Sequence, residues 1–279
     1  VQAIIRAREL HLIAPAHPTR DTPASVRAPK PINPYKGLLA FKQEDCQDFF
    51  GRETVVQKLL EHMGQVTALP VSREAKYARF LAIVGASGSG KSSLVHAGLV
   101  PAFWRGDLLQ PEHWYVAEML PGSRPLDSLE IALMKLAPNA AINLREQLQR
   151  DRHGLVRAAD LILPGMDKEL VLIVDQFEEL FTQVYTEAAR VEFLNLLGGA
   201  VLGLHSRVRI VITLRADFYD RPLIYPEFGE MVRSRMVTLL PLSPQELERA
   251  IVAPAERVGA SFEPGLVASI ISDVNYQPG

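Results

Sequence analysis

The sequence predicts an α/β fold in which helices flank a parallel sheet of five strands. Short apolar segments alternate along the chain with amphipathic segments of helical length, a pattern typical of a parallel sheet covered on both faces. The segment at 169–174 ends in five consecutive apolar residues, which indicates a strand buried on both faces. A glycine-rich loop at 85–92 also joins the first strand segment to a helical one, and open α/β sheets bind ligands at such junctions.

The expected elements follow this alternation in order. Strands are expected at residues 79–84, 114–119, 169–174, 207–213 and 236–240. Helices are expected at 53–64, 91–103, 125–136, 141–150, 187–203, 244–258 and 263–273. The helix at 244–258 has the clearest start, because Ser243 and Glu246 have the spacing of a capping box. Gly259 is expected to end it.

The chain is expected to have three parts. Residues 1–32 contain a short amphipathic helix followed by a proline-rich stretch, which predicts a semi-rigid linker. Residues 33–242 form the expected α/β domain, and residues 243–279 a C-terminal helical extension. Because the sequence begins without methionine, we expect a fragment of a longer protein.

The net charge, the cysteine content and the length of the apolar runs limit the classes of partner that we expect. A net charge of −2 and a pI near 6.4 give no general electrostatic attraction to nucleic acid or to an anionic membrane surface. The single cysteine, Cys46, cannot form an internal disulfide, and the histidines have no metal-ligand spacing. No apolar run approaches the roughly 20 residues that span a bilayer. We therefore expect a cytoplasmic protein with no membrane partner and no direct nucleic-acid binding by this segment.

The stretch from Gly85 to Ser92, GASGSGKS, matches the pattern GxxxxGK[ST]. Glycines let the backbone curl around phosphate oxygens, with its N–H groups pointing inward at the start of a helix. Lys91 is expected to reach the β and γ phosphates of a nucleotide, and the Ser92 hydroxyl to bind Mg²⁺. A flanking strand and helix favour this interpretation over a Gly/Ser-rich surface turn. The expected nucleotide-binding residues here are Gly85, Ala86, Ser87, Gly88, Ser89, Gly90, Lys91, Ser92 and Ser93.

A carboxylate should hold the metal beside this loop, and LVLIVDQFEEL supplies one. Asp175 follows a buried strand and should emerge at the sheet edge where ligands bind, so we assign it to Mg²⁺. Glu178 and Glu179 follow on the next turn, where either could accept a proton from the attacking water or orient it. The alternative for both is favourable negative charge at a helix N-terminus.

The fourth strand brings two more residues to the same edge, Thr213 and Arg215. An arginine there can stabilise charge on the γ phosphate, although a surface salt bridge is the competing interpretation. No NKxD element for guanine is present, which favours adenine. His96, on the helix after the glycine-rich loop, is expected to pack or to face solvent.

Taken together, GASGSGKS, LIVDQFEELF, TLRADF and the upstream NPYKGLLAFKQEDCQDFFGRE resemble the STAND class of P-loop ATPases. The branch usually called novel STAND, found largely in bacterial multidomain proteins, is the most similar, over about residues 33–279. The resemblance implies a P-loop nucleotide-binding domain over residues 33–242, with strand order 5-1-4-3-2, followed at 243–279 by the start of a truncated helical lid region. It also implies effector and sensor domains elsewhere in the full-length chain. It also implies that the GRE segment lies near adenine and ribose, which makes Phe50, Gly51 and Arg52 candidate base contacts. Glu53 could equally serve only as an N-cap and first-turn residue.

The resemblance also indicates a switch. The spacing of Asp175, Glu178 and Glu179 resembles that of NACHT-type relatives, whereas AAA+ enzymes usually have Glu where this chain has Gln176. We therefore predict slow Mg²⁺-dependent ATP hydrolysis. In related proteins ADP holds a closed monomer, and exchange for ATP permits self-association that activates an effector domain. The alternatives are a scaffold with a structural nucleotide and a small-molecule phosphotransferase, for which we find no acceptor lid.

Overall fold

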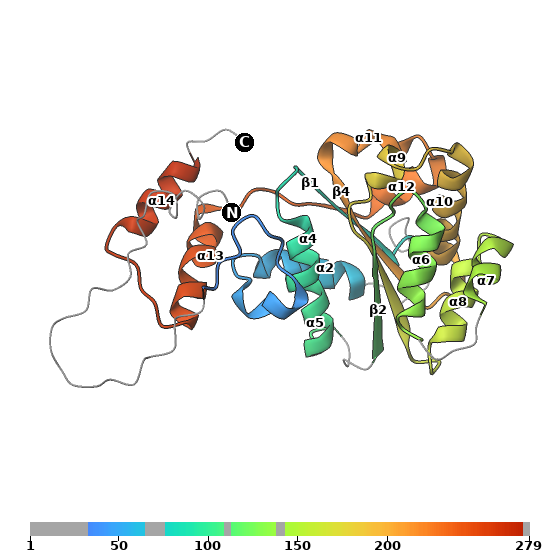
Figure 1. Ribbon diagram of the computed structural model, residues 1–279, viewed down its shortest axis with the longest axis horizontal. Coiled ribbons are helices and arrows are strands. Elements are labelled where there is room, and N and C mark those ends of the chain that lie inside the picture. Colours follow the sequence, from blue (N-terminus) through green and yellow to red (C-terminus); the bar gives the residue numbers. More distant parts are fainter. Residues whose placement is uncertain (1–32, 65–75, 109–112, 138–142, 276–279) are drawn as a thin grey trace. The chain divides into compact units, whose positions relative to one another are not determined.

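The computed structural model describes residues 33–64, 76–108, 113–137 and 143–275. The predicted helix and the predicted linker within residues 1–32 lie outside the described residues. The described chain divides into two compact units (Figure 1). The larger unit consists of residues 54–241, and the smaller unit consists of residues 33–53 and 242–275.

The larger unit contains the predicted parallel sheet. Its strands are β1 (Phe80–Gly85), β2 (Trp114–Met119), β3 (Glu169–Val174), β4 (Val208–Arg215) and β5 (Met236–Thr238). All neighbouring strands pair in parallel, in the order β2-β3-β4-β1-β5. This is the predicted order 5-1-4-3-2 read from the other side, so the predicted fold class is confirmed. Because the strands are parallel, the ends of β1, β3 and β4 lie at one edge of the sheet.

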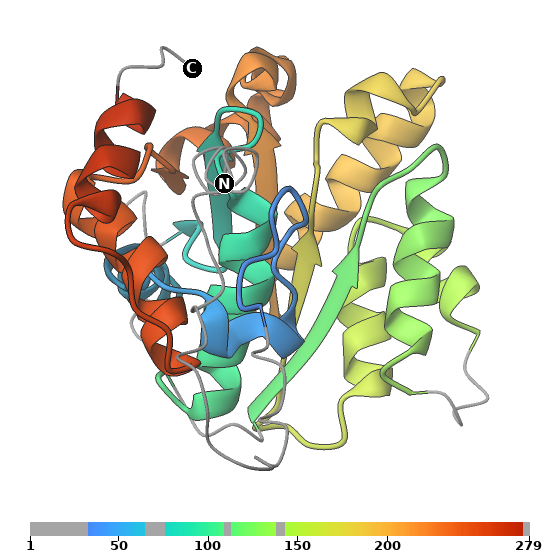
Figure 2. The same ribbon diagram turned by 60° about the vertical axis from the view of Figure 1, so that its left-hand side comes forward.

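Helices cover both faces of this sheet (Figures 1 and 2). The helical segments between residues 53 and 234 are α2 (Glu53–Gly64), α4 (Lys91–Ser93), η2 (Leu94–Leu99), α5 (Val100–Arg105), α6 (Pro125–Met134), α7 (Leu144–Arg150), α8 (Gly154–Ile162), α9 (Glu179–Thr182), α10 (Glu187–Leu202), η4 (Ala216–Phe218), α11 (Asp220–Leu223) and α12 (Pro226–Ser234). The segments α4, η2 and α5 are continuous and follow the glycine-rich loop; η2 is π-helical. Helices α6, α8, α10 and α12 pack on the opposite face from α4 and α5.

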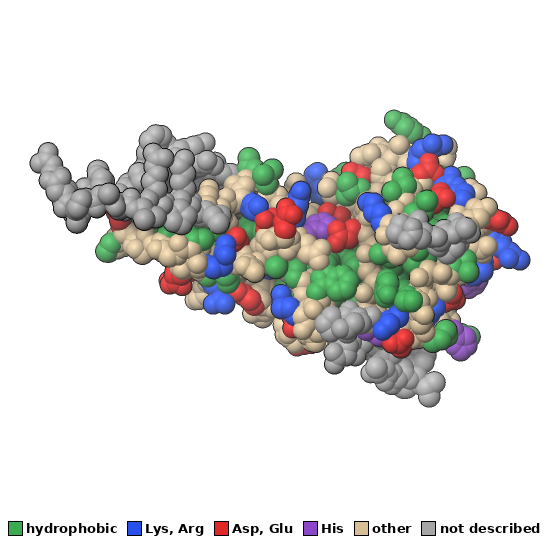
Figure 3. Space-filling view, turned by 60° about the horizontal axis from the view of Figure 1, so that its bottom comes forward, with side chains coloured by type: hydrophobic (Ala, Val, Ile, Leu, Met, Phe, Trp, Pro, Cys, Tyr) green, Lys and Arg blue, Asp and Glu red, His purple; other side chains and the backbone are tan. Residues whose placement is uncertain are grey.

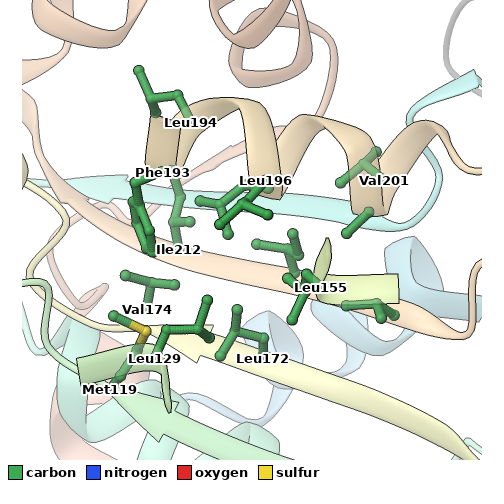
Figure 4. Close-up of a cluster of buried hydrophobic side chains, with 14 of the residues drawn as sticks. Met119, Leu129, Leu155, Leu172, Val174, Phe193, Leu194, Leu196, Val201 and Ile212 are labelled. Carbon is green, nitrogen blue, oxygen red and sulfur yellow. The ribbon is translucent and has the colours of Figure 1, made fainter. Parts of the chain in front are cut away.

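The main hydrophobic core fills the space between the sheet and helices α6, α8 and α10 (Figure 4). Leu172 and Val174 of β3 and Ile212 of β4 are fully buried there. They pack with Phe193 of α10 and Leu129 of α6, among others. Burial of each such side chain contributes on the order of 1.5–3 kcal/mol, so the core holds β3 and β4 firmly in register. The residues at the ends of these strands are thereby held on a rigid base.

Two helices of this layer, α8 and α12, were not predicted from the sequence. In α8, buried Leu155, Ala158 and Ile162 lie at helical spacing, so the signal was present but short. In α12, Gly229 weakens the helical pattern. A Cβ at Gly229 would lie 2.9 Å from the Cα of Leu223, so close packing against α11 requires glycine there.

The smaller unit is built around a pair of helices, α13 (Pro244–Arg257) and α14 (Leu266–Asn275). Leu247 and Ile251 of α13 pack with Ile270 of α14. The predicted capping box of α13 is present, with Ser243 and Glu246 bonded reciprocally. A 3₁₀ turn, η1 (Gln43–Asp48), and the Tyr35 hydroxyl, which donates to the Ile251 carbonyl at 2.6 Å, join residues 33–53 to this pair.

Charged groups of both signs are mixed on the surface. On the face drawn in Figure 3, basic and acidic side chains lie interspersed among hydrophobic and neutral ones. This mixing agrees with the net charge of −2. Within residues 33–64, 76–108, 113–137 and 143–275, no helix has both the length and the apolar character that crossing a bilayer requires.

Candidate functional site

The glycine-rich loop is open toward solvent at two glycines. Gly88 and Gly90 have φ angles of 74° and 90°, in the left-handed region that favours glycine. A Cβ atom on either would meet nothing within 4 Å, so space for a ligand lies beside the backbone. Gly85 is required for a different reason: a Cβ there would lie 2.9 Å from the Leu239 carbonyl oxygen. The loop is thus packed at its start and open at its tip.

The helix that begins at Lys91 provides unpaired donors. The first N–H groups of a helix lack intrahelical acceptors and carry partial positive charge, so they bind anions well. Gly90, the N-cap, offers no side-chain cap. The Ser89 Oγ is buried without a hydrogen-bond partner among the described residues. These features fit a bound phosphate group.

The Lys91 side chain reaches back over the loop. Its Nζ donates to the carbonyl oxygens of Gly85 at 2.9 Å and Ala86 at 2.8 Å, and the residue is only 8% exposed. An ammonium group has three N–H donors, so one remains for a phosphate oxygen. Burial lowers the Lys91 pKa, and the nearby Glu178 carboxylate opposes that shift.

The end of β3 brings Asp175 against Ser92. The Ser92 hydroxyl donates to Asp175 Oδ1 at 3.0 Å, and the Thr213 hydroxyl donates to the same oxygen. Asp175 is 6% exposed. Burial alone would raise its pKa, but hydrogen bonds from His96, Thr213 and Ser92 outweigh burial, so the Asp175 pKa is lowered. A serine hydroxyl beside an ionised carboxylate is the oxygen pair that Mg²⁺ uses together with nucleotide phosphates.

The turn after Asp175 has an unusual backbone. Gln176 has a φ of 52°, uncommon for a residue other than glycine. The turn is fixed by Thr213, whose hydroxyl accepts from the Gln176 N–H at 2.9 Å and whose carbonyl accepts from the Phe177 N–H at 2.8 Å. Thr213 therefore anchors both the carboxylate and the turn that follows it, a double role that its place at the end of a strand did not predict.

This turn sends the two glutamates in different directions. Glu178 Oε2 accepts from the Arg215 N–H at 3.3 Å, and its charge acts on Lys91. Glu179 Oε2 instead accepts from the Gly122 N–H at 3.0 Å, in the loop between β2 and α6. Glu178 thus lies with the phosphate-loop lysine, whereas Glu179 is bonded to a neighbouring loop.

Arg215, at the end of β4, is held by its own segment. Its guanidinium pairs with Asp217 through Nε to Oδ1 at 3.0 Å and Nη2 to Oδ2 at 2.7 Å. It also lies over the Phe218 ring, with 5.4 Å between the guanidinium carbon and the ring centroid. The side chain remains 38% exposed. Because an exposed ion pair contributes little free energy, the guanidinium can leave Asp217 for a stronger anion at small cost.

Two residues of the site, His96 and Glu118, were not predicted from the sequence. Instead of only packing or facing solvent, His96 lies between two carboxylates, with Nε2 3.4 Å from Asp175 Oδ2 and Nδ1 3.0 Å from Glu118 Oε2. These contacts raise the His96 pKa to about 9. One signal could have found it: His96 is four residues after Ser92 and so shares a face of the helix.

The segment Phe50 to Arg52 belongs to the smaller unit. Gly51 has a φ of 85°, and a Cβ there would lie 2.3 Å from the Glu246 carbonyl oxygen, so packing against α13 requires glycine. Glu53 Oε2 accepts from the Gly51 N–H at 3.0 Å, as expected for a residue that supports a helix start. Burial lowers the Arg52 pKa, against the nearby charge of Glu246. That these residues contact the base stays a prediction.

No group of three or more His, Cys, Asp and Glu side chains in the described part of the chain is arranged to hold a metal ion by itself. A Mg²⁺ site of the P-loop kind does not need such a group. Such a site takes one or two protein oxygens and completes the octahedron with phosphate oxygens and waters. Ser92 and Asp175 are the residues that fit this role.

A strand, a GxxxxGKS loop and a helix, with a buried aspartate at the end of a nearby parallel strand, define a P-loop nucleoside triphosphatase. Within that class, the chain belongs to the novel STAND NTPase family, because the family model described as novel STAND NTPase 1 matches residues 34–279. The predicted resemblance is therefore confirmed.

Comparison with solved structures finds similarity to the Aeropyrum pernix ORC2 protein, determined as ADPNP–ADP complexes. The two chains are 16% identical, the match covers 80% of this chain and 68% of that one, and the TM-score is 0.43. A comparison with curated proteins gives no match.

Proposed function

We propose that this chain is an ATP/ADP-binding regulatory switch module with slow Mg²⁺-dependent ATP hydrolysis. The proposal rests on one observation: the glutamate carboxylates after β3 are already hydrogen-bonded to backbone N–H groups. Gln176 follows Asp175 directly, and both glutamates beyond it accept backbone N–H groups. A carboxylate engaged in this way is less available to take a proton from water, which favours holding nucleotide over rapid turnover.

The loop N–H groups and Lys91 bind the phosphates in this proposal. Ser92 and Asp175 hold Mg²⁺, which when bound would neutralise charge on the phosphate oxygens. Arg215 exchanges Asp217 for the γ phosphate and so distinguishes ATP from ADP. The base is contacted by Phe50, Gly51 and Arg52, as the family resemblance implies.

We assign the water-orienting role to Glu178 rather than to Glu179. The Glu178 charge acts on Lys91, and its carboxylate accepts from the Arg215 backbone. The Glu179 carboxylate supports the loop before α6 through Gly122. This division of roles is supported by hydrogen bonds to different parts of the sheet edge.

A nucleotide can act as a switch only through different affinities for two states of the protein. The γ phosphate supplies such a difference at Arg215, because ADP has no group to compete with Asp217 there. In the proposed cycle ADP favours a resting monomer and ATP favours self-association through the nucleotide domain. Effector and sensor domains elsewhere in the full-length protein would respond to the change from monomer to self-associated form.

The first test measures nucleotide directly. The purified chain is denatured and the released nucleotide identified by chromatography; calorimetric titrations with MgADP and MgATP follow, for wild type, Lys91→Ala and Lys135→Ala. Lys135 is an exposed lysine at the C-terminal end of α6 and serves as the matched control. We expect co-purified ADP, and binding that is lost in Lys91→Ala but retained in Lys135→Ala.

Unchanged nucleotide binding by Lys91→Ala would overturn the proposal. Two further results would favour the alternatives. Rapid ATP-dependent formation of a phosphorylated small molecule would indicate a phosphotransferase. Tight binding with no difference between ADP and ATP in exchange or self-association would indicate a structural nucleotide in a scaffold.

A further inference from the structure

The two oxygens of the Asp175 carboxylate have different partners. Oδ1 accepts from the hydroxyls of Ser92 and Thr213. Oδ2 faces His96 Nε2 at 3.4 Å. The direction in which Oδ1 points toward Ser92 therefore depends on what holds Oδ2, because a carboxylate rotates as a unit about its bond to Cβ.

His96 is itself held from the other side. Its Nδ1 lies 3.0 Å from Glu118 Oε2, near the end of β2. The residue belongs to η2, a π-helical stretch within the helix that follows the phosphate loop. Such stretches are rare in helices and frequent at functional sites, because they change the direction in which a side chain points. The link Glu118–His96–Asp175 thus joins β2, the phosphate-loop helix and β3.

We propose that His96 is a positioning residue that fixes the rotation of the Asp175 carboxylate for Mg²⁺, and that Glu118 holds the His96 ring for this task. The inference rests on the proposed function, since it concerns the metal that accompanies the nucleotide. Groups that orient metal ligands from outside the coordination sphere typically change metal affinity by 10–100-fold when they are removed.

The test separates the effect of His96 on Mg²⁺ binding from its effect on nucleotide binding. ADP binding is measured by calorimetry in EDTA and over a series of Mg²⁺ concentrations, for wild type, His96→Ala and the exposed control His205→Ala. We expect His96→Ala to need about tenfold more Mg²⁺ for the same gain in ADP affinity. Its ADP affinity in EDTA and that of His205→Ala in both conditions should match wild type.

Two conservative variants test which ring nitrogen matters. A glutamine amide nitrogen lies near the position of the histidine Nε2, and an asparagine amide nitrogen near that of Nδ1. We expect His96→Gln to restore much of the Mg²⁺ response, because it can still donate to Asp175, and His96→Asn to restore little. Glu118→Ala should give an intermediate loss, since the ring keeps one partner.

Three outcomes would overturn the inference. They are an unchanged Mg²⁺ requirement in His96→Ala, an equal loss of ADP affinity in EDTA and in Mg²⁺, and rescue by asparagine rather than by glutamine.

A readout without nucleotide keeps the test independent of the proposed function. If His96 and Asp175 interact, His96→Ala and Asp175→Asn should have non-additive effects on the free energy of unfolding, and additive effects would also contradict the link. A wild type that binds no nucleotide would contradict the proposed function alone.

Discussion

At the scale of single residues, neighbours in the sequence acquire different roles through one turn. Glu178 and Glu179 are indistinguishable as sequence signals, since both follow a buried strand and a metal-side aspartate. The left-handed Gln176 and the two backbone hydrogen bonds that Thr213 accepts decide their directions. A pattern of residue types can place a carboxylate at a sheet edge, but it cannot specify which backbone N–H the carboxylate accepts.

This division predicts unequal effects of two matched substitutions. Glu178→Gln should slow single-turnover ATP hydrolysis by about 10²-fold, because a neutral amide orients and polarises the attacking water less strongly than the carboxylate does. Glu179→Gln should leave that rate within a few-fold of wild type, but should lower the free energy of unfolding by about 1 kcal/mol, because its bond to Gly122 loses a charge. Rapid-quench hydrolysis and urea unfolding measure the two effects. A slower rate only in Glu179→Gln would reverse the assignment.

At the scale of elements, the sequence was most informative where burial dominates. The predicted ranges of β2 and β3 match the structure at both ends, and β1 and β4 differ by one or two residues. Fully apolar or alternating strands carry a clear signal because the core determines their composition. His96 and Glu118 were missed because their meeting depends on β2 lying next to β3 and on the π-helical stretch. The spacing of four residues from Ser92 could place His96 on the phosphate-loop side of its helix, but only strand neighbours and local helix geometry bring it to Glu118.

The ion pair between Arg215, at the end of β4, and Asp217, in η4, leads us to predict how the protein distinguishes ATP from ADP. Asp217 holds Arg215, so in our proposal its carboxylate competes with the γ phosphate for the guanidinium. Removing that competitor in Asp217→Asn should raise the affinity for a non-hydrolysable ATP analogue relative to ADP by about 2–5-fold, the worth of an exposed ion pair. Calorimetry of both nucleotides measures the ratio.

Asp220→Asn is the matched control, since Asp220 is an exposed acid in the next element and pairs with Arg221, whereas Arg215 pairs with Asp217. It should leave the ratio unchanged. Arg215→Ala should remove the preference for the ATP analogue over ADP. In the double variant, Asp217→Asn should then have no further effect on the ratio of the two affinities. An effect of Asp217→Asn that persists without Arg215 would show that Asp217 acts on the phosphates directly.

At the scale of the whole molecule, two compact units share one chain, and the predicted ligand contacts are divided between them. The phosphate-loop residues belong to the larger unit, and Phe50 to Arg52 belong to the smaller unit. A ligand stabilises whatever part of a protein it binds in the folded state, by an amount set by its concentration relative to its dissociation constant. Thermal unfolding can therefore report which unit each part of the nucleotide contacts.

We expect MgADP at a hundred times its dissociation constant to stabilise the larger unit by about 2.7 kcal/mol, which raises its unfolding temperature by several degrees. If Phe50 to Arg52 contact the base, the transition of the smaller unit should rise as well, and Arg52→Ala should reduce that second shift. Inorganic pyrophosphate, which has no base, should stabilise only the larger unit. Differential scanning calorimetry, with hydrogen exchange to assign each transition, measures both shifts. If MgADP left the unfolding temperature of the smaller unit unchanged, nucleotide would bind the larger unit alone. That result would contradict the assignment of the base contacts.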